Sequence, residues 1–355
     1  MNVLLSGLSS DRVEINLAQA LKLNGVDLHV IADPNTPAVT MCREAGIPVT
    51  SHFFRHRLDR QAITLYRDLC AGRKFDILHC LTNRAVSTGL WAMRQHARGP
   101  RIVAYRGTMG HLSRFDPASH LSYLNRRIDS IVCVSDAVKK YLKTFSIPDE
   151  KLEVIWKGHD TSWYTASARS ALLEFGIPVD SLVVNFTGNI RPVKGVHYLL
   201  KAFESISPVA GIHLLVVGEV RDPDIRKKIG KHPHIHFAGF RKDATSLAGA
   251  CDIAVMPSIE REGLPKSILE AMAQGVPSVV TQVGGLPELV EDGKCGLVVP
   301  PKNSTAIADA IMKLAGDREL LMQMRESARA RVAGPFNFRH TVEKTLALYR
   351  RLLGS

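Results

Sequence analysis

The sequence lacks the features that most directly mark membrane, secreted and metal-binding proteins. No apolar run approaches the ~20 residues that a helix needs to span a bilayer. The six cysteines are scattered without a C-x-x-C pair, so we expect neither a disulfide framework nor a zinc site. The chain starts with a strand-like segment, Met1 to Gly7, without a basic segment and cleavage pattern. These absences predict a cytosolic protein, and secretion is not expected.

The common nucleotide and metal motifs are also missing. Neither G-x-G-x-x-G nor G-x-x-x-x-G-K-[ST] occurs, which argues against ordinary dinucleotide and P-loop sites. The 14 histidines include no H-E-x-x-H pair. His232, His234 and His236 alternate along a predicted strand, either as a fortuitous metal site or, as we favour, on one hydrated strand face. The D-x-D letters of Asp222 to Asp224 fall in a predicted surface loop, so we expect no metal.

Acidic residues are absent between Asp76 and Asp116, in a chain whose net charge is +12. The basic residues of this stretch are Arg84, Arg94, Arg98, Arg101, Arg106 and Arg114, with His79, His96 and His111. Just upstream, His52 to Arg57 form an aromatic and basic loop. Such a region suits an anionic partner, namely membrane head groups, a phosphorylated glycan or nucleic acid. A solvated basic surface is the alternative interpretation.

The length of 355 residues and the apolar fraction of 45% predict two domains, each with its own core. Strand-like and helix-like segments alternate through both halves, which is typical of α/β proteins with parallel sheets covered on both faces. Loop-like sequence near 160 to 175 separates the halves, and Pro335 interrupts the last helical segments. We therefore predict domains at residues 1–165 and 166–335 and a helix in 336–355. Two such sheets favour a ligand between them, at the carboxyl ends of the strands.

The most informative stretch runs from Pro257 to Ala273 and holds Glu262 and Glu270, eight positions apart. It predicts a buried strand, a tight turn, and a helix that starts at Lys266. Free N–H groups at that helix N-terminus favour an anion such as a diphosphate. The two carboxylates suit sugar hydroxyls better than phosphate. The stretch therefore predicts a nucleotide-sugar site, with surface salt bridges to Arg261 or Lys266 as the alternative.

Three motifs, in order, resemble the retaining glycosyltransferases of family 4. They are Gly188-Asn189-Ile190-Arg191-Pro192-Val193-Lys194-Gly195, the Glu262 to Glu270 segment, and Gly284-Gly285-Leu286-Pro287-Glu288. The resemblance is strongest across residues 181–300, and the domain plan extends it over the chain. It implies the GT-B fold, in which two Rossmann-like domains face each other across a cleft and a C-terminal helix packs back toward the first. It also implies an acceptor site in the first domain and a donor site in the second.

The resemblance implies roles for single residues of the second domain. Lys194 would contact the donor diphosphate, Glu270 the ribose hydroxyls, and Glu262 the donor sugar. Gly263 and Leu264 would offer backbone N–H groups to the sugar or the phosphates. In this scheme Lys194 and Glu262 take part in the reaction, and no metal cofactor is required.

The resemblance also implies roles for two residues of the first domain, and the sequence departs from the family pattern at one position of the second. Gly7 would lie in a loop that closes on the phosphates, and His111 would lie beside the reacting sugar, with His79 as a competing candidate. Asn189 stands where the family pattern has arginine, so its diphosphate contact would pass to Arg191 or be lost.

The resemblance implies a metal-independent, retaining transferase that moves a hexose-type sugar from a nucleotide diphosphate sugar to an acceptor hydroxyl. The basic first domain favours an anionic acceptor, such as a lipid-linked or lipopolysaccharide-type glycan, and contact with the inner face of a membrane. A nucleotide-sugar epimerase is one alternative. A non-enzymatic protein that binds RNA or membranes is another, but it explains the charge without the motifs. No RNA-binding signature is present, so nucleic acid is not an expected partner.

Overall fold

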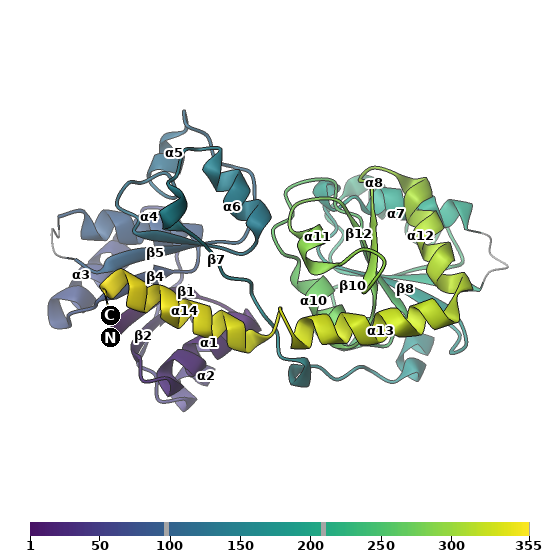
Figure 1. Ribbon diagram of the computed structural model, residues 1–355, viewed down its shortest axis with the longest axis horizontal. Helices are drawn as coiled ribbons and strands as arrows, with labels where there is room; N and C mark the ends of the chain where they lie inside the picture. Colours follow the sequence, from purple (N-terminus) through teal and green to yellow (C-terminus); the bar gives the residue numbers. More distant parts are fainter. Residues whose placement is uncertain (96–98, 207–210, 355) are drawn as a thin grey trace. The chain divides into compact units, whose positions relative to one another are not determined.

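The computed structural model describes residues 1–95, 99–206 and 211–354. These residues form two compact units, Met1–Lys157 with Phe338–Ser355, and Gly158–Asn337 (Figure 1). Each unit holds one parallel sheet with helices around it, so the expectation of two Rossmann-like domains is confirmed. His96 and Arg98 of the basic stretch lie outside the described residues.

Seven parallel strands form the sheet of the first unit in the part of the chain that the structure describes. Their order is β3-β2-β1-β4-β5-β6-β7, which reverses direction between β1 and β4. In open α/β sheets, ligands bind beyond the carboxyl ends of the strands at such a reversal. The strands are β1 (Asn2–Leu8), β2 (Asp27–Ala32), β3 (Val49–Ser51), β4 (Ile77–Cys80), β5 (Arg101–Arg106), β6 (Ser130–Cys133) and β7 (Leu152–Val154).

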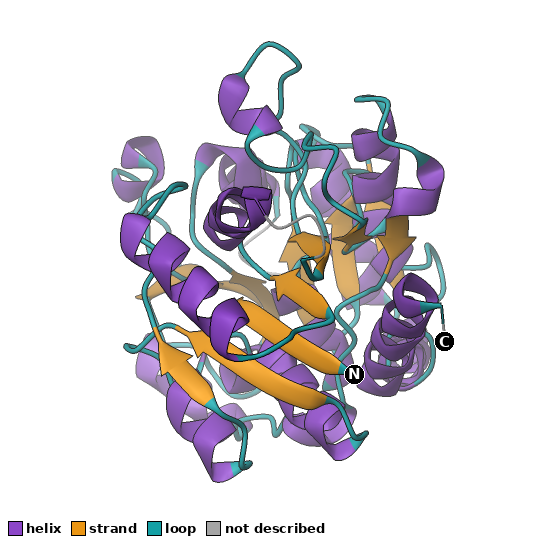
Figure 2. Ribbon diagram, turned by 90° about the vertical axis from the view of Figure 1, so that its left-hand side faces the viewer, coloured by secondary structure: helices purple, strands orange, loops and turns teal. Residues whose placement is uncertain are grey.

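Helices lie on both faces of this sheet (Figure 2). They are α1 (Arg12–Leu23), α2 (Ala38–Glu44), α3 (Arg60–Gly72), α4 (Asn83–Ala92), α5 (Pro117–His120), α6 (Asp136–Lys143) and α14 (Phe338–Leu353), with the 3-10 helices η1 (Met93–Gln95) and η2 (Asp149–Lys151). The sequence analysis assigned no element between residues 33 and 75, where α2, β3 and α3 lie. Among the described residues, every helix is too short or too polar to cross a membrane.

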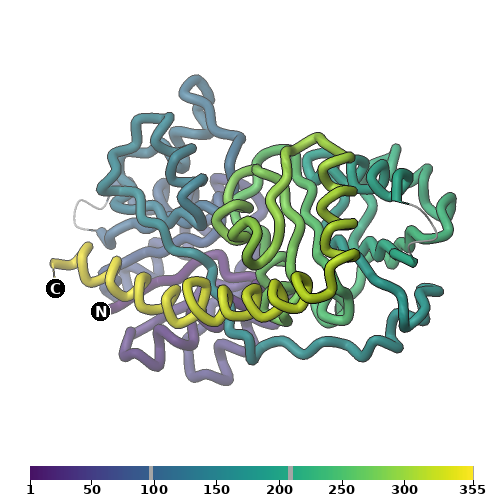
Figure 3. Tube along the Cα trace, turned by 45° about the vertical axis from the view of Figure 1, so that its right-hand side comes forward, coloured from purple at the N-terminus to yellow at the C-terminus, as the bar shows by residue number. Residues whose placement is uncertain are grey.

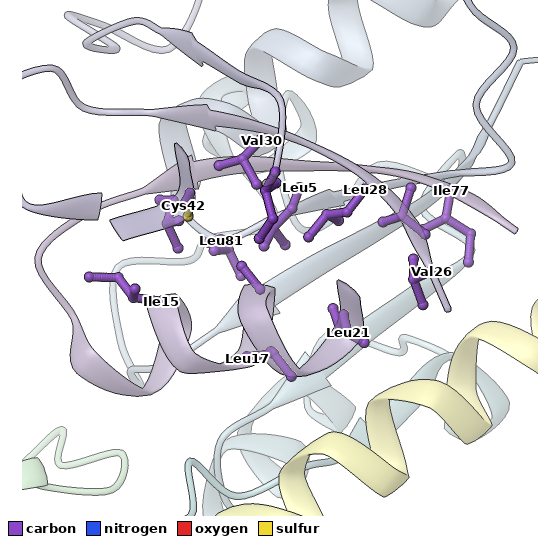
Figure 4. Packing of buried hydrophobic residues seen from close by; sticks show 14 of the residues in the cluster. Leu5, Ile15, Leu17, Leu21, Val26, Leu28, Val30, Cys42, Ile77 and Leu81 are labelled. Atoms are coloured by element: carbon purple, nitrogen blue, oxygen red, sulfur yellow. The ribbon is translucent and has the colours of Figure 1, made fainter. Parts of the chain in front are cut away.

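Helix α1 shows how local signals and packing agree. Asp11 caps the helix, because its carboxylate accepts a hydrogen bond from the N–H of Val13 at 3.0 Å. Leu17 and Leu21, one turn apart, are buried with Leu28 and other residues of β1 and β2 (Figure 4). Burying each leucine stabilises the fold by about 1.5–3 kcal/mol, so this face of α1 is held firmly against the sheet.

The C-terminal helix α14 belongs to the first unit, although it follows the second unit in sequence (Figure 3). Thr341 Oγ1 donates to the carbonyl of Trp156 at 2.8 Å, and the buried hydroxyl of Tyr349 lies 2.7 Å from His79 Nδ1. Burial lowers the pKa of His79 to about 3, so its ring is neutral. The expectation that the last helix packs back toward the first domain is confirmed.

Six parallel strands form the sheet of the second unit within its described residues, in the order β10-β9-β8-β11-β12-β13. The reversal lies between β8 and β11. The strands are β8 (Leu182–Thr187), β9 (Ile212–Val217), β10 (Ile235–Gly239), β11 (Ile253–Met256), β12 (Ser278–Thr281) and β13 (Gly296–Val299). The helices are α7 (Val196–Ser205), α8 (Pro223–Arg226), α9 (Ala244–Gly249), α10 (Lys266–Ala273), α11 (Leu286–Leu289), α12 (Ser304–Gly316) and α13 (Arg318–Ala333), with the 3-10 helices η3 (Thr161–Trp163), η4 (Arg169–Phe175) and η5 (Pro192–Lys194).

Residues 158–165 pack within the second unit. The N–H of His159 donates to the carbonyl of Phe336 at 2.8 Å, and Asp160 caps η3 through the N–H of Ser162. Gly158 has no room for a side chain, because a Cβ atom there would lie 2.5 Å from the carbonyl oxygen of Asn337. The two chain segments at the ends of this unit are therefore joined closely.

Three histidine rings meet at the edge of the second sheet. His213 Nδ1 on β9 lies 3.0 Å from His236 Nε2 on β10, and His213 Nε2 lies 3.3 Å from His234 Nδ1. Burial and the neighbouring His234 and His236 rings lower the pKa of His213 to about 4. A proton on His213 would be both desolvated and repelled, so the His213 ring is neutral near pH 7.

We expect this cluster to make the fold sensitive to acid. A histidine whose pKa is lowered on folding binds fewer protons in the native state, so stability falls as the pH drops from about 6.5 toward 4. His213→Leu is expected to reduce the loss of thermal midpoint between about pH 7 and about pH 5. His120→Gln, at an exposed site in the first unit, is the control. Equal losses in wild type and His213→Leu would contradict the prediction.

Candidate functional site

Two loops of the second unit meet where its strand order reverses. The loop after β8 carries η5 and ends at Lys194 and Gly195, and the loop after β11 carries Glu262. Gly195 has a φ of 63°, and a Cβ atom there would lie 2.1 Å from the carbonyl oxygen of Pro257. The N–H of Ile259 also donates to the carbonyl of Val193 at 3.0 Å. Glycine at 195 therefore lets the two loops pack directly against each other.

This packing brings Lys194 and Glu262 into contact across 68 positions of sequence. Lys194 Nζ lies 2.8 Å and 3.0 Å from the two carboxylate oxygens of Glu262, and Ser258 Oγ donates to the same carboxylate at 2.7 Å. The side chains are only 15% and 12% exposed. A partly buried charged pair is held more firmly than a surface ion pair, so both groups are ordered in advance of any ligand.

The second carboxylate, Glu270, lies on α10 one residue beyond its first turn. Its Oε2 accepts a hydrogen bond from Thr245 Oγ1 of α9 at 3.0 Å, and Lys266 Nζ approaches Oε1 at 3.9 Å. The side chain of Glu270 is 12% exposed. The alternative of a simple surface salt bridge to Lys266 therefore accounts for only part of its surroundings.

The start of α10 has no side-chain cap, because Pro265 occupies the N-cap position. Gly263 is buried and Leu264 is half-buried in the turn just before it. The N–H of Gly285 donates to the carbonyl of Glu262 at 3.2 Å, which ties the Gly284-Gly285 turn to the same loop. Backbone N–H groups and the positive end of a helix dipole therefore lie beside the Lys194–Glu262 pair and suit an anion.

Asn189 and Arg191 follow β8 but differ from Lys194 in their surroundings. Both are exposed, and the side chain of Arg191 makes no hydrogen bond or ion pair within the described residues. The turn itself packs closely on the loop after β9, since a Cβ atom on Gly218 would lie 2.0 Å from the carbonyl oxygen of Gly188. The structure thus brings Lys194 and Glu262 together and leaves Arg191 free to meet a ligand.

A cavity of about 390 Å³ lies at the strand reversal of the first unit. Its lining comes from the ends of β1, β2 and β3 and the start of α4: residues 7–9, Asp33, 52–54 and 82–84. Gly7 has a φ of 86°, and a Cβ atom there would lie 2.9 Å from Thr82 Oγ1. Gly7 therefore lies in a switch-point crevice, with the aromatic loop that begins at His52 beside it.

His111 lies in the loop after β5 and is not a lining residue of that cavity. It is exposed and has a φ of 61°, a conformation that non-glycine residues seldom adopt. The buried Arg106 side chain holds the loop, because it donates to the carbonyls of Thr108 at 2.8 Å and Gly110 at 2.5 Å. The competing candidate, His79, is buried against Tyr349 and has a structural role.

The described residues contain no group of three or more His, Cys, Asp or Glu side chains placed to hold a metal ion. In the D-x-D segment, Asp222 caps α8 and Asp224 lies 2.9 Å from Lys227 Nζ. These contacts explain both carboxylates without a metal.

Sequence reasoning missed two polar neighbours of the candidate site. Ser258 lies within the Pro257 to Ala273 stretch but was given no role, yet its hydroxyl donates to Glu262, and the hydroxyl of Thr245 on α9 donates to Glu270. The position of Ser258, four residues before Glu262, was an available signal. Nothing in the sequence connects Thr245 with Glu270, because their contact depends on how α9 packs on α10.

Two family models match this chain. Residues 11–163 match the model described as Glycosyltransferase Family 4, and residues 181–317 match the model described as Glycosyl transferases group 1. One match covers most of the first unit, and the other falls within the second.

The chain is also similar to curated proteins. It is 28% identical over 230 residues to N-acetyl-alpha-D-glucosaminyl L-malate synthase of Bacillus anthracis, across 63% of this chain and 60% of that protein. It is 30% identical over 240 residues to D-inositol 3-phosphate glycosyltransferase of Mycobacterium bovis, across 63% and 48%. The matches therefore span less than two thirds of these relatives.

Solved structures share the fold over nearly the whole chain. HepE of Anabaena in complex with UDP and glucose has a TM-score of 0.82 at 22% identity and covers 99% of this chain and 100% of that one. A glycosyltransferase from Rickettsia africae has a TM-score of 0.83 at 19% identity and covers 99% and 98%. At these identities the similarity shows the fold.

Proposed function

Because the chain belongs to glycosyltransferase family 4, we propose that it is a retaining glycosyltransferase that moves a sugar from a nucleotide diphosphate sugar to an acceptor hydroxyl. One observation carries this proposal: the ordered Lys194–Glu262 pair lies beside the uncapped start of α10. A cation, a carboxylate and free helix N–H groups at one switch point match the parts of a sugar diphosphate.

In this proposal the donor binds the second unit in one orientation. Glu270 accepts hydrogen bonds from the ribose hydroxyls, the diphosphate lies at the start of α10, and Glu262 holds the sugar. Gly263 and Leu264 offer N–H groups in the turn between them. Structures of HepE contain UDP and UDP-glucose, so a UDP-hexose is the first donor to test.

The transfer breaks the bond between the anomeric carbon and the diphosphate oxygen and forms one to the acceptor oxygen on the same face. The departing phosphate oxygen takes the acceptor proton, so no separate base is required. Lys194, with Arg191 and Asn189 nearby, stabilises the charge that develops on the leaving diphosphate. These groups and the helix dipole can neutralise the diphosphate, so the proposal includes no metal.

The first unit takes the acceptor. Its cavity at Gly7 combines the aromatic side chains of Phe53 and Phe54 with Arg84, and the surrounding stretch is basic. These features support an anionic acceptor, such as a phosphorylated or lipid-linked glycan, used at the cytoplasmic face of a membrane. In this proposal Gly7 and His111 keep the roles that the family resemblance implies for them.

The proposal is tested by thermal shifts with UDP, GDP and ADP and their hexose derivatives. A ligand at a hundred times its Kd stabilises the native state by about 2.7 kcal/mol, which gives a clear shift. Glu270→Gln is expected to weaken nucleotide binding by about tenfold, because a charged acceptor for ribose hydroxyls is lost. Glu260→Gln, the same change at an exposed position before the site, is the control.

Transfer itself is measured as donor consumed with and without candidate acceptors. The absence of a shift with every nucleotide, or equal affinities for Glu270→Gln and Glu260→Gln, would contradict the donor site. Conversion of the donor to an isomeric sugar without transfer would contradict the transferase and point to an epimerase.

A further inference from the structure

Phe115 is an apolar side chain displayed in water, since it is 95% exposed. The turn that carries it is ordered, because Asp116 accepts hydrogen bonds from the N–H of Ala118 at 3.0 Å and from Ser119 Oγ at 3.1 Å. The N–H of Ser113 also donates to Ser119 Oγ at 3.1 Å. The segment around α5 stands out from the rest of the first unit (Figure 1). The hydrogen bonds of this turn therefore hold Phe115 in its exposed position.

A second cavity of the first unit, of about 350 Å³, adjoins this segment. Arg114 and His120, on either side of Phe115 in sequence, line it together with Arg126 and Lys151. Its apolar wall consists of Tyr123, Leu124, Ile128, Ile131, Phe145 and Ile147. The cavity thus combines an apolar wall with basic groups.

Helix α6 extends the basic surface. Its Tyr141 hydroxyl accepts a hydrogen bond from the N–H of Leu112 at 3.3 Å, and Arg114 donates to the carbonyl of Thr144 just beyond the helix at 2.7 Å. The loop and α6 therefore form one surface, the α5–α6 face, defined by Arg114, Phe115, Arg126, Lys140, Lys143 and the cavity.

The cations of this face are only partly neutralised. Asp149 lies 3.1 Å from Lys143 and 3.2 Å from Lys139. Arg126 and Lys140 are exposed, and their side chains form no ion pair in the part of the chain that the structure describes. The carboxylate of Asp116 is used to cap α5. The face therefore presents positive charge around an exposed aromatic ring.

We propose that the α5–α6 face docks onto a bilayer that contains anionic lipids. Phe115 enters the interface, Arg126 and Lys140 meet the head groups, and the apolar wall of the cavity takes up part of one lipid. Single-stranded RNA would be expected to use several stacking rings, whereas this face displays one. This proposal is independent of the proposed sugar transfer, so the failure of one would leave the other standing.

The test is co-sedimentation of the full chain with vesicles of phosphatidylcholine alone or mixed equally with phosphatidylglycerol. Binding is expected only to the mixed vesicles and is expected to weaken as salt is raised. Phe115→Ser is expected to lower the partition coefficient by about tenfold, because the ring no longer leaves water. Leu23→Ser, at an apolar residue 86% exposed at the end of α1, is the matched control and should bind like wild type.

The contribution of charge is tested separately with the double variant Arg126→Gln/Lys140→Gln. We expect its partition coefficient on the mixed vesicles to fall by roughly fivefold for each cation removed. Equal binding to both vesicle types, or unchanged binding by Phe115→Ser, would overturn the proposal. If inorganic phosphate released the protein from the vesicles more than chloride did at equal ionic strength, the result would overturn the proposal in favour of a site for a free anion. Salt-dependent RNA binding or self-association lost in Phe115→Ser, without vesicle binding, would overturn it in favour of those partners.

Discussion

Replacing Lys194 by methionine is expected to lower the rate constant of sugar transfer by roughly 10²–10³-fold, the effect of removing one group that stabilises transition-state charge. The ammonium group is paired with Glu262, whose turn leads into α10, whereas Arg191, another cation of the loop after β8, is exposed. The measurement is the initial rate of nucleotide diphosphate release at saturating donor and acceptor. Arg191→Met is the control for loss of a cation from the same loop and should have a smaller effect.

The substitution also leaves the carboxylate of Glu262 without its cation. Removing one partner of a partly buried pair is destabilising, so the thermal midpoint of Lys194→Met is expected to fall. The double variant Lys194→Met/Glu262→Gln removes both charges and should regain stability but not activity. Full activity in Lys194→Met, or recovery of activity along with stability in the double variant, would contradict a role in the reaction.

Gly195→Ala is expected to destabilise the second unit by about 2–4 kcal/mol, from overpacking together with the left-handed backbone conformation. A Cβ atom at 195 would lie 2.1 Å from the carbonyl oxygen of Pro257, and the φ of 63° is unfavourable for alanine. Because this contact joins the loops of Lys194 and Glu262, nucleotide binding should weaken as well. Urea unfolding and a thermal shift with UDP measure the two effects.

Gly25→Ala separates the two causes. Gly25 also has a positive φ, 79°, but a Cβ atom there would meet nothing within 4 Å. The free energy of unfolding of Gly25→Ala should fall only by the cost of the left-handed backbone conformation, roughly 1–2 kcal/mol. If Gly195→Ala and Gly25→Ala lost equal stability, or if Gly195→Ala bound nucleotide like wild type, close packing of the two loops would not be needed for the site.

Most regular elements were predictable because their signals are local. The last helix is an example, since the sequence analysis predicted a helix in residues 336–355 and the structure has α14 at Phe338–Leu353. The strand and helix around Glu262 and Glu270 were predictable for the same reason, from a short apolar run, turn residues and helical periodicity. Strand β3 was not, because it has only three residues and gains its conformation by pairing with β2. Helix α3 has 13 residues and was also missed, although Asp59 caps it.

The residues of the candidate site also fall into those that local motifs identify and those that only the tertiary structure identifies. Lys194, Glu262 and Glu270 were identified from motifs that a family resemblance made specific, and their roles stay predictions. Their partners Ser258 and Thr245 are ordinary polar residues, which sequence alone does not distinguish from many others. Likewise, His79 competed with His111 for the same role, and burial of His79 against Tyr349 on α14 separates the two.

What the sequence determined by itself is most of the strands and helices and the residue types placed at their ends, because caps, turns and periodicity act over a few positions. The tertiary structure alone decided which of these ends meet. The order of strands brought the loops after β8 and β11 together, and a glycine without a side chain let Lys194 reach Glu262 across 68 positions. Contacts between distant segments depend on packing and strand order, which no local pattern encodes.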